Sequence, residues 1–323
     1  MADVAIRVIQ TVSATLGVLG NVLVCVVIGR VRTMHTLTNA FILNQAAIDL
    51  MGSVFTLIEA NAGRPNPVPP GLAGELYCRV WYSKFFIWAF FAASTYSLVA
   101  LTLERYLAIV FPYRYQVVFT KRKAVLVIVF VWMLGLVNSV YNLIYVAPDG
   151  KGLCVSVKVA GSQIIGAMLF LTEYAIPVAV MLYAYIHITM VLKRSANRVG
   201  PVTGEGAGNH GGQEHQGRAG SLLRARKNVF KTLLIVFCSF VVCWTPNKII
   251  FFMFNFGWPL DFSSSLYVFS VALVAANVFV NPVIYALKYR QFRRGIKVLL
   301  GRAVHADEIF TTSAGQVPIQ SNA

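Results

Sequence analysis

Seven long apolar segments constrain this chain more than any other feature of its sequence. Each has roughly 20 to 30 residues, enough to cross about 30 Å of hydrocarbon as a helix. Inside lipid the backbone must satisfy its own hydrogen bonds, so each segment is expected to be helical. The segments run over residues 5–29, 37–61, 77–110, 124–147, 162–192, 229–256 and 264–287. The sequence therefore predicts an all-α membrane protein, a bundle of seven transmembrane helices.

The positive charges gather on one side of the predicted membrane. Only 12% of the 323 residues are charged, about half the share of a soluble protein, while 57% are hydrophobic. With the N-terminus outside, the cytoplasmic segments hold 20 of the 28 Lys and Arg residues; these segments are 30–36, 111–123, 193–231 and 288–323. This asymmetry follows the positive-inside rule. Topology and contact with the lipid bilayer thus explain the net charge of +16 without nucleic acid.

Two segments outside the spans have distinctive compositions. The connector over 195–224 includes Gly200–Gly220, with eight Gly among 21 residues, and is predicted to be a flexible linker. The stretch Gln291–Leu300 alternates basic and apolar residues, which predicts an amphipathic helix on the inner membrane surface. We expect one membrane domain over 1–302 and a disordered cytoplasmic tail over 303–323.

Polar residues inside the apolar segments are the strongest functional signal. An ionisable residue at mid-membrane is costly and indicates a function by default, and Asp49 stands within the second segment. Four further polar residues lie at depth in other segments: Asn21, Ser94, Asn277 and Asn281. One such residue often serves only as a hydrogen bond between helices. Five together suggest a polar site with oxygen ligands for a small hard cation.

Kinks and a charged pair recur near the ends of the segments. Glu104-Arg105-Tyr106 closes the third segment, where a salt bridge is the ordinary interpretation. Each of the last three segments contains a proline. The fifth has Pro177, eight residues before Tyr185; the sixth has Phe240-x-x-Cys243-Trp244-x-Pro246; and the seventh has Asn281-Pro282-x-x-Tyr285. Such prolines kink helices and provide hinges. Each of these pieces alone is compatible with simple packing.

The five cysteines fall into two groups. Cys25, Cys238 and Cys243 lie inside apolar segments, where a free thiol behaves as a small hydrophobic group. Cys78 and Cys154 lie in or beside polar connectors and form a candidate pair. A channel or transporter would need a continuous polar pathway, and here the polar residues stop at a central cluster. No metal-ligand cluster and no nucleophile with a base supports an enzyme.

Taken in order, these motifs resemble the rhodopsin-like family of G-protein-coupled receptors over about residues 15 to 300. The matching positions are Gly20-Asn21, Asp49, Glu104-Arg105-Tyr106, Trp132, Pro177 with Tyr185, Cys243-Trp244-Thr245-Pro246, Asn281-Pro282-Val283-Ile284-Tyr285, and Phe292. The resemblance implies a plasma-membrane receptor that binds an extracellular ligand and activates a heterotrimeric G protein. Arrestin is a further partner that the family allows.

The resemblance also implies roles for particular residues. In the family the sixth helix moves outward on activation, the counterpart of Arg105 leaves its acidic neighbour, and the counterparts of Tyr185 and Tyr285 rearrange. Phe240, Trp244 and Pro246 match the toggle of the sixth helix. Arg226 stands where some members carry an acid that braces the third-helix arginine, so Glu104 is the expected resting partner of Arg105.

Two sites follow from the same resemblance. A disulfide between Cys78 and Cys154 would tie the third helix to the second outer loop. An allosteric sodium site would involve Asp49, Ser94, Asn277 and Asn281, with Trp244 above it and Asn21 nearby; no other cofactor is implied. The alternative is a protonated Asp49 that is hydrogen-bonded to the asparagines.

The ligand class is inferred from the outer half of the bundle. Amine receptors carry an Asp at the position of Ile87, and opsins carry a Lys at the position of Ala275, so both classes are disfavoured. The alternating Cys154–Val159 predicts a short hairpin over the ligand site. Together with Thr-Leu-Glu-Arg-Tyr-Leu-Ala-Ile-Val over 102–110 and Cys-Trp-Thr-Pro-Asn over 243–247, this stretch resembles neuropeptide receptors of the somatostatin, galanin and allatostatin kind. A small non-amine ligand is the alternative. The expected ligand pocket comprises Glu59, Lys84, Ile87, Glu173, Lys248 and Phe251.

Glu173 and Lys248 carry opposite charges on adjacent helices of that pocket. They are expected either to form an ion pair for which a charged ligand group competes, or to be separately hydrated. Three departures from the family pattern stand out. Gln45 replaces the usual Leu, no Pro follows Trp132 in the fourth segment, and Cys78 lies 27 residues before Arg105, two more than is common.

Overall fold

The fold was analysed in a computed structural model, which describes residues 2–157, 159–198 and 210–301. Within this part of the chain, seven helical segments are long and apolar enough to cross a membrane. The predicted seven-helix bundle is therefore confirmed. The segments are Ala2–Arg30, Leu37–Asn61, Leu72–Val110, Lys121–Tyr145, Ser162–Ser195, Asn228–Asn255 and Ser265–Lys288.

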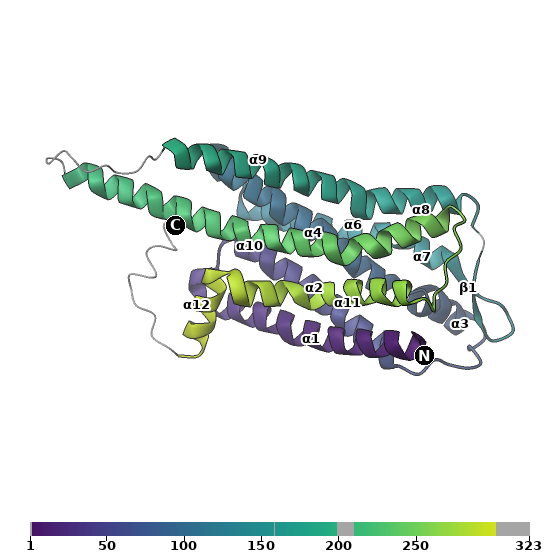
Figure 1. The fold of residues 1–323 in the computed structure, drawn as a ribbon. Coiled ribbons are helices and arrows are strands. Elements are labelled where there is room, and N and C mark those ends of the chain that lie inside the picture. The colour runs from purple at the N-terminus through teal and green to yellow at the C-terminus, as the bar shows by residue number, and fades with distance from the viewer. Residues whose placement is uncertain (1, 158, 199–209, 302–323) are drawn as a thin grey trace.

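Most spans coincide with one helix each. They are α1 (Ala2–Arg30), α2 (Leu37–Asn61), α6 (Lys121–Asn138) with the short α7 (Val140–Tyr145), α10 (His210–Asn255) and α11 (Ser265–Lys288). The short connectors η1 (Arg32–Met34) and α5 (Pro112–Val118) lie between spans at one end of the bundle. The helices run side by side along a common direction, and α9 and α10 project past the others (Figure 1).

The polar side chains at mid-span face the interior of the bundle, alongside its apolar core, whereas many large apolar side chains also face outward. Asn39, Gln45, Asp49 and Glu104 are all at most 3% exposed. Large apolar side chains such as Leu126 are exposed on the outer faces of the spans. Because hydrocarbon does not solvate polar groups, these have to be satisfied between helices, while exposed apolar residues face lipid without penalty.

The third span is interrupted near the disulfide, where a continuous helix over 77–110 was predicted. It consists of α3 (Leu72–Leu76), a π-helical segment η2 (Tyr77–Tyr82) and α4 (Phe85–Val110). Lys84, between the last two, has a φ of 60° in the left-handed region. A π turn accommodates additional residues, so η2 and the turn at Lys84 absorb the two extra residues between Cys78 and Arg105.

The fifth span is also divided into segments. It consists of α8 (Ser162–Phe170), the π-helical segment η3 (Leu171–Ala175) and α9 (Ile176–Arg198). Pro177 lies just after this segment. It has no N–H to donate to the carbonyl of Glu173, four residues earlier, and its ring would clash with that carbonyl. The helix widens over this turn, and Glu173 lies within the widened segment.

The predicted hairpin forms at the same end of the bundle as α3. Strand β1 (Val146–Pro148) pairs antiparallel with β2 (Cys154–Ser156), with Ala147 opposite Val155. The carboxylate of Asp149 caps the turn by accepting from the backbone N–H groups of Lys151 and Leu153, at 2.7 and 3.0 Å. These two hydrogen bonds lower the pKa of Asp149.

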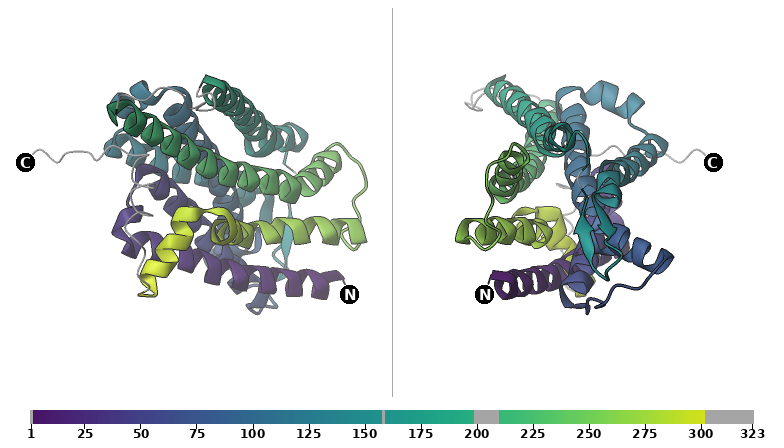
Figure 2. Two further views of the ribbon diagram at one scale, coloured as in Figure 1. Left: turned by 60° about the vertical axis from the view of Figure 1, so that its left-hand side comes forward. Right: turned by 90° about the vertical axis from the view of Figure 1, so that its right-hand side faces the viewer.

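The opposite end carries a short helix, α12 (Arg290–Leu299), within one residue of the predicted amphipathic helix. It lies across the end of α11, far from the N-terminus of α1 (Figure 2). Phe292 is buried beneath it with 1% exposure, and Gly295 packs so closely on Met34 that a Cβ would lie 2.6 Å from its sulfur.

The linker predicted over 195–224 differs in extent. Helix α9 ends at Arg198, and α10 begins at His210, well before the expected start of the sixth span at residue 229. Adding residues to an existing helix costs far less than nucleating one, so the sixth span extends into this segment. The predicted flexibility of 199–209 and the predicted disorder of the tail over 303–323 lie outside the described residues.

Gly135 sets the closest approach between α6 and α4. A Cβ at this position would lie 2.6 Å from the carbonyl oxygen of Ala89 and 2.9 Å from the backbone nitrogen of Ala93. Backbone atoms cannot yield as a flexible side chain would. Small residues at such crossings allow helices to pack in lipid.

We predict that Gly135→Ala destabilises the protein by about 1–3 kcal/mol through overpacking. The control is Gly29→Ala, because a Cβ at Gly29 meets nothing within 4 Å and alanine favours a helix over glycine. Thermal unfolding of detergent-purified protein measures both. An equal or higher melting temperature for Gly135→Ala than for Gly29→Ala would contradict the close contact.

Candidate functional site

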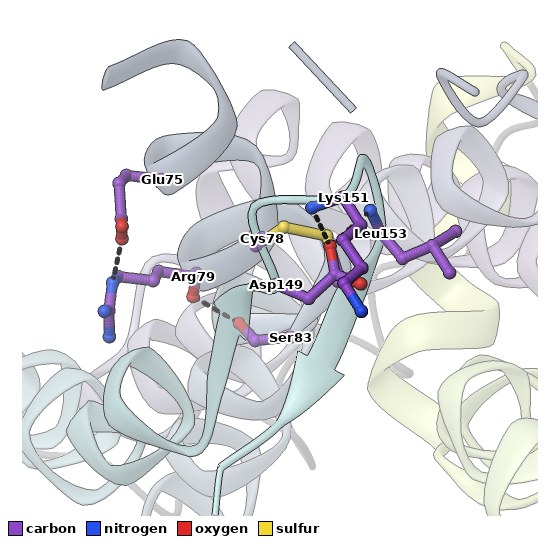
Figure 3. The surroundings of a disulfide bond; sticks show 8 residues. Glu75, Cys78, Arg79, Ser83, Asp149, Lys151 and Leu153 are labelled. Carbon is purple, nitrogen blue, oxygen red and sulfur yellow. Dashed lines mark hydrogen bonds and ion pairs between the residues drawn. A yellow bond between two sulfur atoms is a disulfide. The ribbon is translucent and has the colours of Figure 1, made fainter. Parts of the chain in front are cut away.

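A disulfide ties the third span to the hairpin, as the family resemblance implied. Cys78, in η2, is bonded to Cys154, the first residue of β2 (Figure 3). Cys25, Cys238 and Cys243 are free thiols. Beside the disulfide, Arg79 binds Glu75 at 2.5 Å and donates to the carbonyl of Leu143 at 3.0 Å. The hairpin is thereby fixed over one end of the bundle.

A cavity of about 140 Å³ opens at this end, between α1, α2, α4, α10 and α11. Its walls are largely aromatic and aliphatic, with Trp88, Phe91 and Phe251 among them. Four of the expected pocket residues line it, namely Glu59, Lys84, Ile87 and Phe251. Ligand sites in proteins are typically such concave, mostly apolar cavities with a few polar groups.

Glu59 is the acidic residue in the lining of this cavity. Its carboxylate lies 3.2 Å from Lys84 Nζ and 3.4 Å from Arg64, and its side chain is only 9% exposed. The left-handed conformation of Lys84 is unfavourable for a residue with a Cβ, and the ion pair with Glu59 helps to hold it. Thr56 Oγ1, in the same wall, is buried and has no hydrogen-bond partner in the described part of the chain.

Glu173 and Lys248 do not line this cavity, in contrast to the sequence-based expectation. They form an ion pair with each other, between η3 and α10, and each side chain is 14% exposed. Asn138 of α6 donates to the other carboxylate oxygen of Glu173 and accepts from Thr172 at 3.2 Å. Glu173 belongs to the π-helical segment η3, directly before Pro177, and its carboxylate meets Lys248 of α10 there.

Trp244 lies between the cavity wall and this ion pair. Its ring packs edge-on against Phe91, with 5.5 Å between centroids, and Lys248 Nζ stands 5.2 Å from its centroid. Phe240 lies one turn away with its centroid at 6.2 Å. Two residues beyond Trp244, Pro246 interrupts the hydrogen bonding of α10. A displacement of Phe91 would therefore reach the kink of α10 through Trp244.

Asp49 lies in a polar cluster at the centre of the bundle. Its carboxylate accepts from Ser94 Oγ at 2.7 Å, from Asn281 Nδ2 at 3.1 Å, and from Gln45 Nε2, which lies 3.1 Å from both oxygens. Gln45 is the residue that departs from the family pattern. The carboxylate thus receives donors from α2, α4 and α11.

Asn21, which was expected near a sodium ion, is engaged with two backbone carbonyls. Asn21 Nδ2 donates to the carbonyls of Gly17 and Val278, both at 2.9 Å. Val278 lies four residues before Pro282, so Asn21 satisfies the carbonyl that this proline leaves without a helical donor. No hydrogen bond joins Asn277 or Trp244 to Asp49 among the described residues. The donor set around Asp49 does not fit a bound cation.

At the opposite end of the bundle, Glu104 and Arg105 form a bidentate pair. Arg105 Nε and a terminal nitrogen both lie 2.5 Å from the Glu104 oxygens. Tyr115 of α5 donates to the same carboxylate at 2.6 Å, and Thr38 of α2 donates at 3.3 Å. Burial, followed by the neighbouring charge of Glu104, raises the pKa of Tyr115. Arg105 is therefore paired with Glu104, and the role of this pair in the resting receptor stays a prediction.

Three tyrosines surround this end of α4. Tyr106 contacts His187 Nδ1 at 2.9 Å, while Tyr185 donates to the carbonyl of Leu233 at 3.0 Å and so joins α9 to α10. The hydroxyl of Tyr285 is buried without a partner among the described residues. The backbone of Arg226 lies in α10, but its side chain lies outside the described residues.

The sequence analysis missed residues that act through others. Tyr115 and Thr38 hold Glu104, Asn138 holds Glu173, and Gln45 holds Asp49. Only Gln45 carried a usable signal, since it lies four residues before Asp49 and therefore on the same face of α2. The others come from separate helices, and their proximity depends on the tertiary packing.

Comparison with known proteins agrees with this geometry. Residues 20–285 match the model of the 7 transmembrane receptor (rhodopsin family). The chain is 29% identical to galanin receptor 2b of Danio rerio over 92% of its length and 75% of the relative's, and 30% identical to galanin receptor 2a over 93% and 79%. It is 26% identical to the alpha-1A adrenergic receptor of Rattus norvegicus, over 88% of this chain and 65% of that receptor.

The chain belongs to the rhodopsin family of seven-transmembrane receptors. It is accordingly a multi-pass plasma-membrane protein and not an enzyme. The galanin receptors of zebrafish are among its similar relatives, in agreement with the resemblance to neuropeptide receptors.

The Glu173–Lys248 pair generates a charge-reversal prediction. Glu173→Lys or Lys248→Glu alone leaves two like charges in a largely buried site, which should cost about 3–5 kcal/mol. Surface expression should fall several-fold for each single variant and recover in the double variant. The control is Glu75→Lys, a change at an exposed carboxylate whose ion pair with Arg79 is worth little, so it should have little effect. A double variant no better than the sum of the single variants would contradict the pairing.

Proposed function

We propose that this receptor converts the binding of an extracellular peptide into nucleotide exchange on a heterotrimeric G protein. The observation that carries the proposal is the placement of two sites at opposite ends of one bundle. The cavity with Glu59 and Lys84 lies at the disulfide end, and the Glu104–Arg105 pair lies at the other. In this proposal the N-terminus is outside, as the positive-inside rule indicates.

A physical connection between the two ends supports signal transfer. The cavity residue Phe91 contacts Trp244, and Trp244 contacts Phe240. The same helix, α10, also carries Leu233, whose carbonyl accepts a hydrogen bond from Tyr185. A ligand that favours another position of Phe91 would shift the population of α10 conformations. Release of Arg105 from Glu104 would then expose a cationic side chain to the G protein.

The chemistry of the cavity and the relatives together favour a peptide. A cavity of about 140 Å³ is smaller than the usual ligand site of ~300–1,000 Å³, so it admits one side chain or a chain end, while the rest of a peptide would lie on the hairpin. Ile87, in its wall, offers no charge for an amine. The similarity to galanin receptors points to the same ligand class. The small volume also favours the second candidate, a small non-amine ligand.

Exchange of a non-hydrolysable GTP analogue in membranes tests the proposal. Pools of synthetic peptides, of biogenic amines and of small acids and lipids are applied to wild type and to Glu59→Gln. The peptide pool should stimulate exchange, and Glu59→Gln should raise the half-maximal concentration about ten-fold, since a charged hydrogen bond contributes ~1.5–3 kcal/mol. Glu75→Gln, outside the cavity, is the control. Stimulation by the amine pool alone would contradict the peptide assignment, and failure of all pools with every G protein would contradict the proposed function.

Arg226 provides a prediction for the resting receptor. Arg226→Glu would place an acid where it can form an ion pair with Arg105. A partly exposed ion pair contributes ~0.5–1 kcal/mol, so the rate of ligand-free nucleotide exchange should fall about two- to five-fold. Arg224→Glu is the matched control, because two residues along a helix point to nearly opposite faces. Unchanged or raised basal exchange for Arg226→Glu, at equal surface expression, would count against this bracing.

A further inference from the structure

Gln45 is fully buried next to the carboxylate that the family resemblance assigned to a sodium ion. Its exposure is 0%, and it precedes Asp49 by one helical turn in α2. Its Nε2 lies 3.1 Å from each oxygen of Asp49 and 2.6 Å from Ser94 Oγ. The amide nitrogen therefore stands in front of the carboxylate, on the bisecting position that a bound cation would take.

The orientation of this amide follows from chemistry. The side-chain oxygen of a glutamine would repel a carboxylate, whereas the NH₂ group donates two hydrogen bonds. The Gln45 oxygen points elsewhere and has no partner in the described part of the chain. The donor end of the amide, with its partial positive charge, therefore faces Asp49.

Ser94 and Asn281 also donate to the carboxylate, one hydrogen each. The NH₂ group of Gln45 has two hydrogens, which it shares between the two Asp49 oxygens and Ser94 Oγ. Ser94 donates its hydroxyl hydrogen to Asp49, so its lone pair can accept from Gln45. The cluster is closed by neutral donors alone.

A hard cation needs several oxygen ligands that are free to face it. Here the two Asp49 oxygens and Ser94 Oγ are engaged with the amide of Gln45. Asn21 is used at the Val278 carbonyl, and no hydrogen bond links Asn277 to the cluster among the described residues. A cation at the carboxylate would have to displace the NH₂ group of Gln45 from both Asp49 oxygens and from Ser94 Oγ.

We propose that the amide of Gln45 takes the place of the cation at Asp49, so that this receptor is not regulated by sodium. The inference does not depend on the ligand or on G-protein coupling. It predicts a specific gain of function: replacing Gln45 by an apolar residue of similar size frees both carboxylate oxygens and Ser94, and a sodium site should appear.

Thermal unfolding of the purified full-length receptor in NaCl and in choline chloride, at equal ionic strength, tests this with sodium as the probe. The wild-type melting temperature should be the same in both salts. Gln45→Leu should melt higher in NaCl, by about 3 °C at a sodium concentration ten times the dissociation constant. Gln45→Leu with Asp49→Asn should lose the difference. Each comparison is made within one variant, so a general loss of stability in Gln45→Leu cancels.

Two outcomes would overturn the proposal. One is a wild-type receptor stabilised by sodium to a similar degree, with loss of this effect in Asp49→Asn. The other is a Gln45→Leu receptor as insensitive to sodium as wild type. If Gln45→Leu does not fold, Gln45→Met, which keeps the length of the side chain without its donor, replaces it with the same expected results.

Discussion

A backbone carbonyl inside hydrocarbon has to find a donor, and this requirement explains where the functional residues of the bundle lie. Pro282 removes a helical donor from the Val278 carbonyl, and Asn21 of α1 supplies another at 2.9 Å. Pro177 prevents the normal bond of the Glu173 carbonyl, and the helix widens into η3. Each repair brings a polar side chain to a defined place between helices.

Charges in the bundle obey the same requirement more strictly. Glu173 is paired with Lys248, Glu104 with Arg105, and Glu59 with Lys84. Asp49 has no cationic partner at all among the described residues and is held by three neutral donors instead. Because breaking a buried pair leaves a charge uncompensated, these contacts make the bundle a set of discrete arrangements and not a continuously deformable one.

One of these pairs, Glu173–Lys248, includes a residue of α10, the helix that is expected to move on activation from the family resemblance. Lys248 and Trp244 sit on it near the cavity, and the carbonyl of Leu233 holds Tyr185 near the other end. Phe91 joins the cavity wall to Trp244. The proposed peptide site and the proposed G-protein site are therefore connected through one helix, which contains Pro246.

The seven spans, the disulfide, the hairpin over Cys154 and the short helix after Tyr289 could all be predicted from the sequence. The reason is that lipid imposes length and periodicity on single segments, and that motif spacing identifies the family. The cavity lining could be predicted only in part. Glu59, Lys84, Ile87 and Phe251 line it, but Glu173 and Lys248 do not.

What only the tertiary structure decided is which polar groups meet. The two extra residues before Arg105 could be counted in the sequence. Their effect is a break in the helix at Lys84, which brings the Lys84 amine to Glu59. This effect depends on the packing of η2 beside α2. The sequence shows that Gln45 replaces the Leu usual in the family, but it does not show that the Gln45 amide faces the Asp49 carboxylate. Whether an amide replaces a cation depends on distances between three helices, and helix spacing is set by side-chain packing across the bundle and not by the order of residues within one helix.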